Sequence, residues 1–167
     1  MQDFNFYILF LAALIPLIVG FIWYSKPLFA NAWMKAARVT EGDLNKGNFV
    51  LILVLTYVLS LMLSFPMMSL TIHQMSIYSV VANDPALLDP NSELSLYVAE
   101  FRKKYGSNYR TFKHGAFHGV MASLFVALPL IGIVALFERR GFKYIAIHVG
   151  YWMITLALMG GVLCAFV

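Results

Sequence analysis

The segment Phe49–Ser69, FVLILVLTYVLSLMLSFPMMS, is a long apolar run without a single charged side chain. An α-helix needs about 20 residues of this kind to cross the hydrocarbon of a bilayer. Three further stretches of similar length and character lie at about 4–24, 115–137 and 142–166. The sequence therefore predicts an all-α integral membrane protein, in which four transmembrane helices form one bundle and residues 1–167 form a single domain.

The composition supports burial in lipid. Hydrophobic residues make up 61% of the chain and charged residues 12%, whereas a soluble domain carries roughly a quarter charged residues. The net charge of +4 arises from basic residues next to the ends of the apolar stretches, where they meet lipid headgroups. The expected partner of this charge is the bilayer and not a nucleic acid. The single cysteine, Cys164, excludes an intramolecular disulfide.

The basic residues of the connections predict the orientation of the chain in the membrane. Lys and Arg are enriched in cytoplasmic loops, and both the first and the third connection are basic although the two tails contain no Lys or Arg. The basic residues of these two connections are Lys26, Lys35, Arg38, Lys46, Arg139, Arg140 and Lys143. We therefore expect both connections in the cytoplasm, both termini outside it, and an extracytoplasmic connection over about 73–113, although that connection also contains basic residues.

The long second connection contains apolar residues at helical spacing. Charged residues occupy other positions of the helical wheel, which is typical of an amphipathic helix of about three turns. The apolar positions are Leu94, Tyr97, Val98, Phe101 and Tyr105. Such a helix lies on the membrane surface, caps the bundle or docks a partner.

Small residues recur every fourth position in the third apolar stretch, at Gly115, Gly119, Ser123 and Ala127. Small residues at this spacing let two membrane helices approach closely, where the hydrophobic effect contributes little to their association. The pattern predicts a close helix–helix contact in the third span. The contact either joins two spans of one chain or forms the seam of a homo-oligomer.

Several short motifs resemble those of a bacterial membrane-protein family catalogued as domain of unknown function 1761. They lie in the first forty-odd residues and in the last thirty, and the middle of the chain resembles the family less. The matching motifs are Gly20-x-x-Trp23-Tyr24-Ser25, Pro27-Leu28-Phe29-x-x-x-Trp33-Met34-Lys35, Phe137-Glu138-Arg139-Arg140, Gly150-Tyr151-Trp152 and Leu158-Met159-Gly160. The resemblance implies a small multi-pass helical protein of the bacterial inner (cytoplasmic) membrane. It implies no activity, cofactor or catalytic residue.

Histidines supply the only candidate chemistry. His114 and His118 are four residues apart and share one face of a helix, and His73 follows the second span on the same side of the membrane. Three imidazoles that converge there are suited to zinc or copper, and a pair of them is suited to haem iron. Glu100 or Asp84 could add a carboxylate. The alternative is a cluster of ordinary polar side chains at the membrane interface.

The sequence contains no Ser/His/Asp set, no glycine-rich phosphate loop and no CxxC motif. His148 enters the fourth span from the opposite end, where we expect it to be neutral and hydrogen-bonded within the bundle. We therefore expect no enzymatic activity. The first hypothesis is a scaffold or accessory subunit without a cofactor, which works by helix packing and by its outer loop, alone, as a homo-oligomer or in a larger membrane complex. The alternative is a protein that binds metal or haem through His73, His114 and His118.

Overall fold

The computed structural model describes residues 5–167, and these contain helices and no strand. Three helical rods are long and apolar enough to cross a membrane, judged by length and composition. They are α5 (Phe49–Thr71), a second rod formed by α8 (Phe112–Ala122), the π-helical η2 (Ser123–Ala127) and α9 (Leu128–Phe137), and α10 (Phe142–Phe166). These rods occupy the second, third and fourth predicted spans, and the third begins slightly earlier than expected.

The first apolar stretch is a broken helix. It consists of α1 (Tyr7–Ala12) and α2 (Ile15–Trp23), and the break lies just before Pro16. Proline has no backbone N–H and its ring clashes with the preceding turn, so it interrupts a helix. The apolar helical segment Tyr7–Trp23 is consequently shorter than the other three. The predicted start of this span at residue 4 lies outside the described residues.

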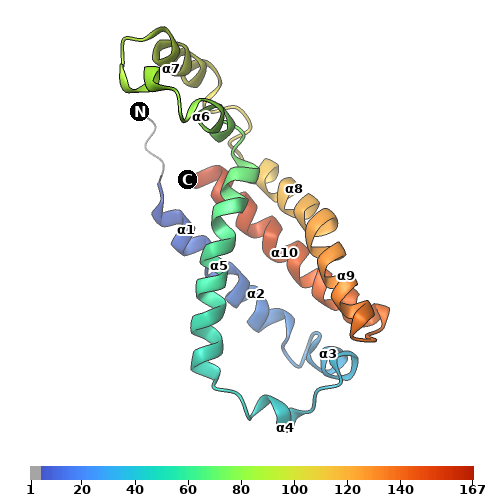
Figure 1. Ribbon diagram of the computed structural model, residues 1–167. Coiled ribbons are helices and arrows are strands. Elements are labelled where there is room, and N and C mark those ends of the chain that lie inside the picture. Colours follow the sequence, from blue (N-terminus) through green and yellow to red (C-terminus); the bar gives the residue numbers. More distant parts are fainter. Residues whose placement is uncertain (1–4) are drawn as a thin grey trace.

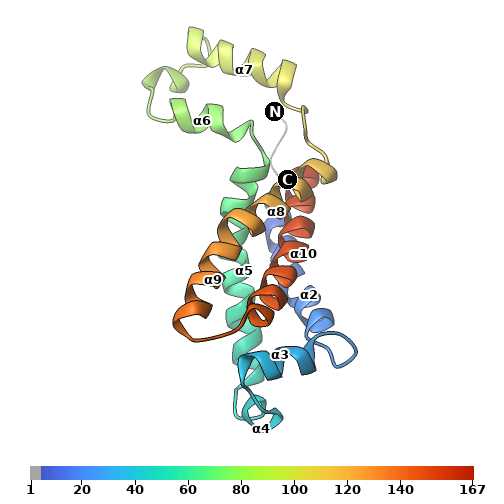
Figure 2. The ribbon, with the colours of Figure 1, turned by 90° about the vertical axis from the view of Figure 1, so that its right-hand side faces the viewer.

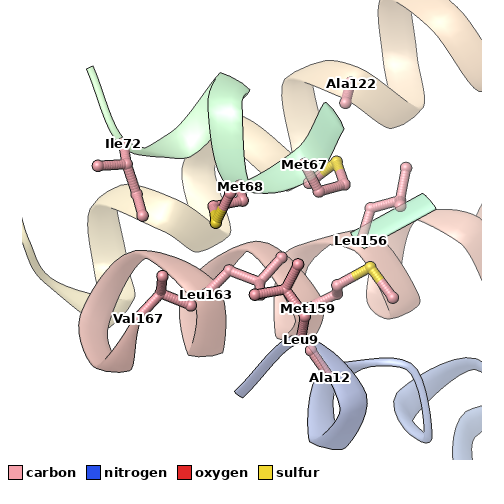
Figure 3. Packing of buried hydrophobic residues seen from close by; sticks show 10 residues of the cluster. All are labelled: Leu9, Ala12, Met67, Met68, Ile72, Ala122, Leu156, Met159, Leu163 and Val167. Carbon is pink, nitrogen blue, oxygen red and sulfur yellow. The ribbon is translucent and has the colours of Figure 1, made fainter. Parts of the chain in front are cut away.

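Helix α10 is the centre of the molecule (Figures 1 and 2). The α8–α9 rod lies along one side of it, and α5 and the α1–α2 segment lie along others. Half of the most apolar part of α10 is buried inside the protein, compared with 11% for α5 and 17% for the α8–α9 rod. Figure 3 shows the apolar core where α1, α5, α8 and α10 meet. Its buried residues are Leu9, Ala12, Met67, Met68, Ile72, Ala122, Leu156, Met159, Leu163 and Val167.

The predicted stripe of small residues lies between α8 and α10. A Cβ atom added to Gly119 would collide with the backbone of Leu156, and one added to Gly115 would collide with the backbone of Gly160. Ser123 continues the stripe, is fully buried, and donates a hydrogen bond of 3.4 Å to the carbonyl of Val149. The predicted close contact is therefore confirmed, and within one chain it joins the third apolar stretch to the fourth.

Short helices lie at the two ends of the bundle. At one end are α3 (Ala30–Ala37) and α4 (Glu41–Leu44). At the other, α6 (Met75–Val81), the 3-10 helix η1 (Pro85–Leu88) and α7 (Glu93–Tyr105) form a hairpin that projects beyond the bundle (Figure 1). Helix α7 covers the segment for which the sequence predicts a helix. The C-terminus and the start of α1 lie at this hairpin end.

Arg110 fastens the hairpin end to α10. Its Nε donates a hydrogen bond of 2.7 Å to the carbonyl of Cys164, and a terminal guanidinium nitrogen donates one of 2.8 Å to the carbonyl of Val167. The last carbonyls of a helix have no partner within the helix, and a cation there also meets the negative end of the helix dipole. Partial burial lowers the pKa of Arg110 from its usual value. The segment that leads into α8 is thereby held against the end of α10.

Candidate metal centre

Three histidines meet where α5 ends and α8 begins. His73 lies in the turn between α5 and α6, two residues after the last residue of α5. His114 and His118 lie on successive turns of α8 and so project from one face. The helix starts before them because Thr111 is its N-cap, and the Thr111 hydroxyl accepts a hydrogen bond of 3.3 Å from the backbone N–H of His114.

The three rings converge through their Nε2 atoms. Nε2 of His73 lies 3.0 Å from Nε2 of His114 and 3.2 Å from Nε2 of His118. One nitrogen from each ring lies within 4.8 Å of the other two. The prediction that His73 and His118 come close together at this end of the bundle is therefore confirmed.

The three converging nitrogens cannot all form good hydrogen bonds with one another. A neutral imidazole nitrogen either donates one proton or accepts one hydrogen bond. Nε2 of His73 has two imidazole nitrogens at hydrogen-bonding distance, and it can form a complementary bond with only one of them. The third nitrogen of the cluster is then left without a well-aligned hydrogen bond to the other two. A cation placed between the three nitrogens gives each of them a partner, because all three lone pairs then point at positive charge.

The spacing of the nitrogens matches the requirement of a metal ion. Zinc binds imidazole nitrogen at about 2.0–2.1 Å in tetrahedral geometry, which places two ligand nitrogens roughly 3.3 Å apart. The two measured separations from His73 are 3.0 and 3.2 Å. The nitrogens of His114 and His118 lie within 4.8 Å of each other, a separation that a change of side-chain rotamer within α8 can adjust. The donor set therefore fits a small divalent ion that prefers nitrogen.

The ligand set consists of imidazoles alone. Among the described residues, the group that could hold an ion contains His73, His114 and His118 and no carboxylate. The suggestion that Glu100 or Asp84 joins the site is therefore wrong. Both acids belong to the hairpin, whose helices project away from the bundle (Figure 2). His73 is exposed and the other two histidines are half-buried, so an ion can reach the site from solution.

Gln74 and Tyr109, which were not identified from the sequence, make contacts that support the site. The side-chain amide of Gln74, next to His73, donates hydrogen bonds of 3.0 Å to the carbonyl of Tyr105 and 2.6 Å to the carbonyl of Asn108. The ring of Tyr109 lies against that of His114, with the centroids 5.2 Å apart. Tyr109 has a left-handed backbone, with φ at 60°. Gln74 thus links the turn that carries His73 to the segment that leads into α8.

His148 lies apart from this cluster, as expected. Its Nδ1 is 2.9 Å from the hydroxyl of Tyr24, and its ring packs on that of Tyr144 with centroids 4.3 Å apart. Tyr24 also packs on Trp33 of α3 at 5.5 Å. His148 therefore belongs to an aromatic contact between α2, α3 and α10 at the other end of the bundle, which is the predicted hydrogen-bonded role.

A comparison with protein families tests the resemblance that was based on motifs near the N- and C-termini of the chain. The model of one family, described as "Protein of unknown function (DUF1761)", matches residues 7–164. The match includes the middle of the chain, where the motifs gave little indication of it, and hence all three clustered histidines. Neither the curated proteins nor the solved structures yielded a match. Because the family model covers nearly the whole chain, this protein belongs to the DUF1761 family.

Proposed function

We propose that this chain is a multi-pass membrane protein that binds one zinc or copper ion through His73, His114 and His118. The observation that carries the proposal is the convergence of three Nε2 atoms, with 3.0 and 3.2 Å between His73 and the other two. Imidazole nitrogen suits both metals, and zinc accepts a set of three histidines with ease. The proposed role is the binding of this ion.

Haem is a poorer candidate than a single ion. Two histidines that ligate haem iron bind on opposite faces of the porphyrin, so the macrocycle has to lie between the rings. Here the nitrogens face one another directly, at 3.0 and 3.2 Å. Zinc or copper requires only small adjustments of the three side chains. The site therefore favours an ion that is surrounded by the three rings.

The proposal includes four spans and an orientation. The α1–α2 segment, Tyr7–Trp23, is near the lower limit of about 17 residues for a transmembrane helix, and with it the chain crosses the bilayer four times. The basic first and third connections then lie in the cytoplasm and the histidine cluster lies outside it. For a bacterial inner-membrane protein, the metal would arrive from the periplasmic or external side.

Metal analysis of the purified protein tests the central proposal. Protein in mild detergent, equilibrated with micromolar zinc or copper and then desalted, is expected to retain one ion per chain by inductively coupled plasma mass spectrometry. His118→Ala is expected to retain none. His148→Gln, which changes the histidine outside the cluster, serves as the control. A wild-type chain that retains no ion with either metal would leave the scaffold or accessory-subunit hypothesis as the better account.

Gln74→Leu tests whether the hydrogen bonds of Gln74 position His73 for metal binding. Loss of an outer partner that orients a metal ligand commonly weakens metal affinity by about 10–100-fold, and we expect a loss in this range because both hydrogen bonds of the amide disappear. The measurement is a competition titration with a zinc chelator. Ser79→Ala is the matched control, since the Ser79 hydroxyl donates a hydrogen bond of 2.8 Å to the carbonyl of Ser76 within α6. Equal zinc affinities for Gln74→Leu and wild type would show that the two hydrogen bonds of Gln74 do not position His73.

Cysteine labelling tests the orientation. In a Cys164→Ala background, Ser95→Cys on α7 is expected to react with a membrane-impermeant maleimide in intact cells, and Ala36→Cys on α3 is expected to react only after the membrane is opened. The two sites lie at opposite ends of the bundle (Figure 1). Labelling of Ala36→Cys from outside would reverse the proposed topology and place the histidine cluster in the cytoplasm.

A further inference from the structure

The histidine cluster supplies three ligands, and a cavity of about 300 Å³ lies beside it. The lining residues of the cavity are His73, Gln74, Phe101, Tyr105, Asn108 and Tyr109. His73 is thus a ligand of the candidate ion and also part of the cavity wall. Tyr109, which packs on His114, forms another part of the wall. The cavity therefore lies between the histidines and the C-terminal end of α7.

Three protein ligands leave a metal ion coordinatively unsaturated. Structural zinc sites are closed by four protein ligands, whereas sites with three protein ligands keep a position for water or another exogenous ligand. A ligating imidazole is neutral. Because no carboxylate joins the histidines among the described residues, no ligand charge offsets the positive charge of the ion. A bound anion is favoured by that charge.

The chemistry of the cavity indicates what kind of anion fits. A volume of about 300 Å³ is at the lower end of the range of small-molecule sites, which are mostly apolar with a few polar groups. Phe101 and Tyr105 form a pair of packed rings there, with centroids 5.1 Å apart. These rings suit an apolar body, while the ion at His73 suits a negatively charged oxygen.

We propose that the metal ion keeps an open coordination position toward this cavity and there binds a small organic anion, a carboxylate with an apolar body, in exchange for water. This inference rests on the proposed metal site. The carboxylate oxygen replaces the metal-bound water, and no covalent bond of the organic anion is made or broken. The apolar body displaces solvent from the faces of Phe101 and Tyr105.

Cobalt-substituted protein provides the test, because the visible spectrum of cobalt(II) reports both its coordination and the exchange of its ligands. Azide is the probe of the open position and is expected to change the spectrum with a saturating titration. Benzoate and acetate together probe the cavity. Benzoate is expected to bind about tenfold more tightly than acetate, because its ring buries apolar area against the aromatic wall.

Two variants alter the cavity without removing a metal ligand. Asn108→Trp fills the cavity and Phe101→Ala removes one of the packed rings, and each is expected to reduce the preference for benzoate over acetate to about two- or threefold, with cobalt and azide binding retained. Tyr97→Ala is the matched control, since Tyr97 lies on the exposed face of α7 outside this cavity. One variant fills the cavity and the other enlarges it. If one of them fails to fold, the other still tests whether the cavity binds the apolar body.

The outcomes separate this inference from the proposed function. Protein that binds no cobalt, zinc or copper contradicts the proposed function itself. Protein that binds cobalt but shows no spectral change with azide or with either carboxylate has a closed metal site, which overturns the inference and leaves the metal proposal intact. Azide binding with equal affinities for benzoate and acetate overturns the assignment of the cavity as the binding site of the apolar body.

Discussion

Gly119→Leu is expected to lower the free energy of unfolding by about 2–3 kcal/mol or more, through overpacking of the contact between α8 and α10. The first atom added at this position already collides with the backbone of Leu156, and it would also lie 2.6 Å from the backbone nitrogen of Ala157. A flexible side chain can rotate away from such a collision, but helix backbone cannot. The two helices therefore have to separate, and the surrounding packing is lost with them.

The chain offers a matched control for this substitution. Gly132 lies on the same rod, in α9, and a Cβ added there would meet no atom within 4 Å. Gly132→Leu is expected to change stability by no more than about 0.5 kcal/mol. Thermal unfolding in detergent, followed by tryptophan fluorescence, compares the two variants. Equal melting temperatures would show that α8 does not pack on α10 through Gly119.

The same contact positions the candidate metal centre. His118 precedes Gly119 in α8, and His114 precedes Gly115, so each clustered histidine lies next to a glycine of the close contact. Displacement of α8 from α10 also moves both histidines relative to His73, which follows α5. We therefore expect Gly119→Leu, in the fraction that stays folded, to bind metal less tightly than Gly132→Leu.

The sequence predicted the helical rods because hydrophobic length is a local property. The fourth stretch, 142–166, coincides with α10, and the second differs from α5 only at its end, Thr71. The third rod begins at Phe112, three residues earlier than predicted, because Thr111 caps the helix in a segment that is still polar. Pro16 breaks the first stretch, and the prediction of one continuous span underestimated this effect.

The approximate location of the histidine cluster was also predictable, but its supports were not. An even spacing of four residues and the order of the spans place His114, His118 and His73 at one end of the bundle. The hydrogen bonds of Gln74 depend on the carbonyls of Tyr105, the last residue of α7, and of Asn108, three residues further along the chain. Contacts of this kind join segments about thirty residues apart through backbone atoms, and no side-chain pattern in the sequence records them.

The largest effect on metal binding is expected from the ligands themselves. His73→Ala, His114→Ala and His118→Ala are each expected to weaken zinc affinity by more than about 100-fold, since loss of an outer partner alone costs 10–100-fold. His73 has the shortest nitrogen contacts to both other rings, and we expect its loss to be the most severe. Competition with a chelator at fixed pH measures the change, and His148→Gln is the control.

The acid dependence of zinc affinity distinguishes three ligands from two. Zinc binds the unprotonated imidazole, so protons compete with zinc for the ring nitrogens. The affinity is expected to fall with falling pH, and once the metal-free cluster is protonated the logarithm of the binding constant approaches a slope of about 3 per pH unit if the three clustered histidines all bind. In His118→Ala the slope is expected to approach about 2. A wild-type affinity that stays constant while the histidines of the metal-free protein bind protons would exclude histidine ligation, because imidazole cannot hold a metal ion and a proton on the same nitrogen.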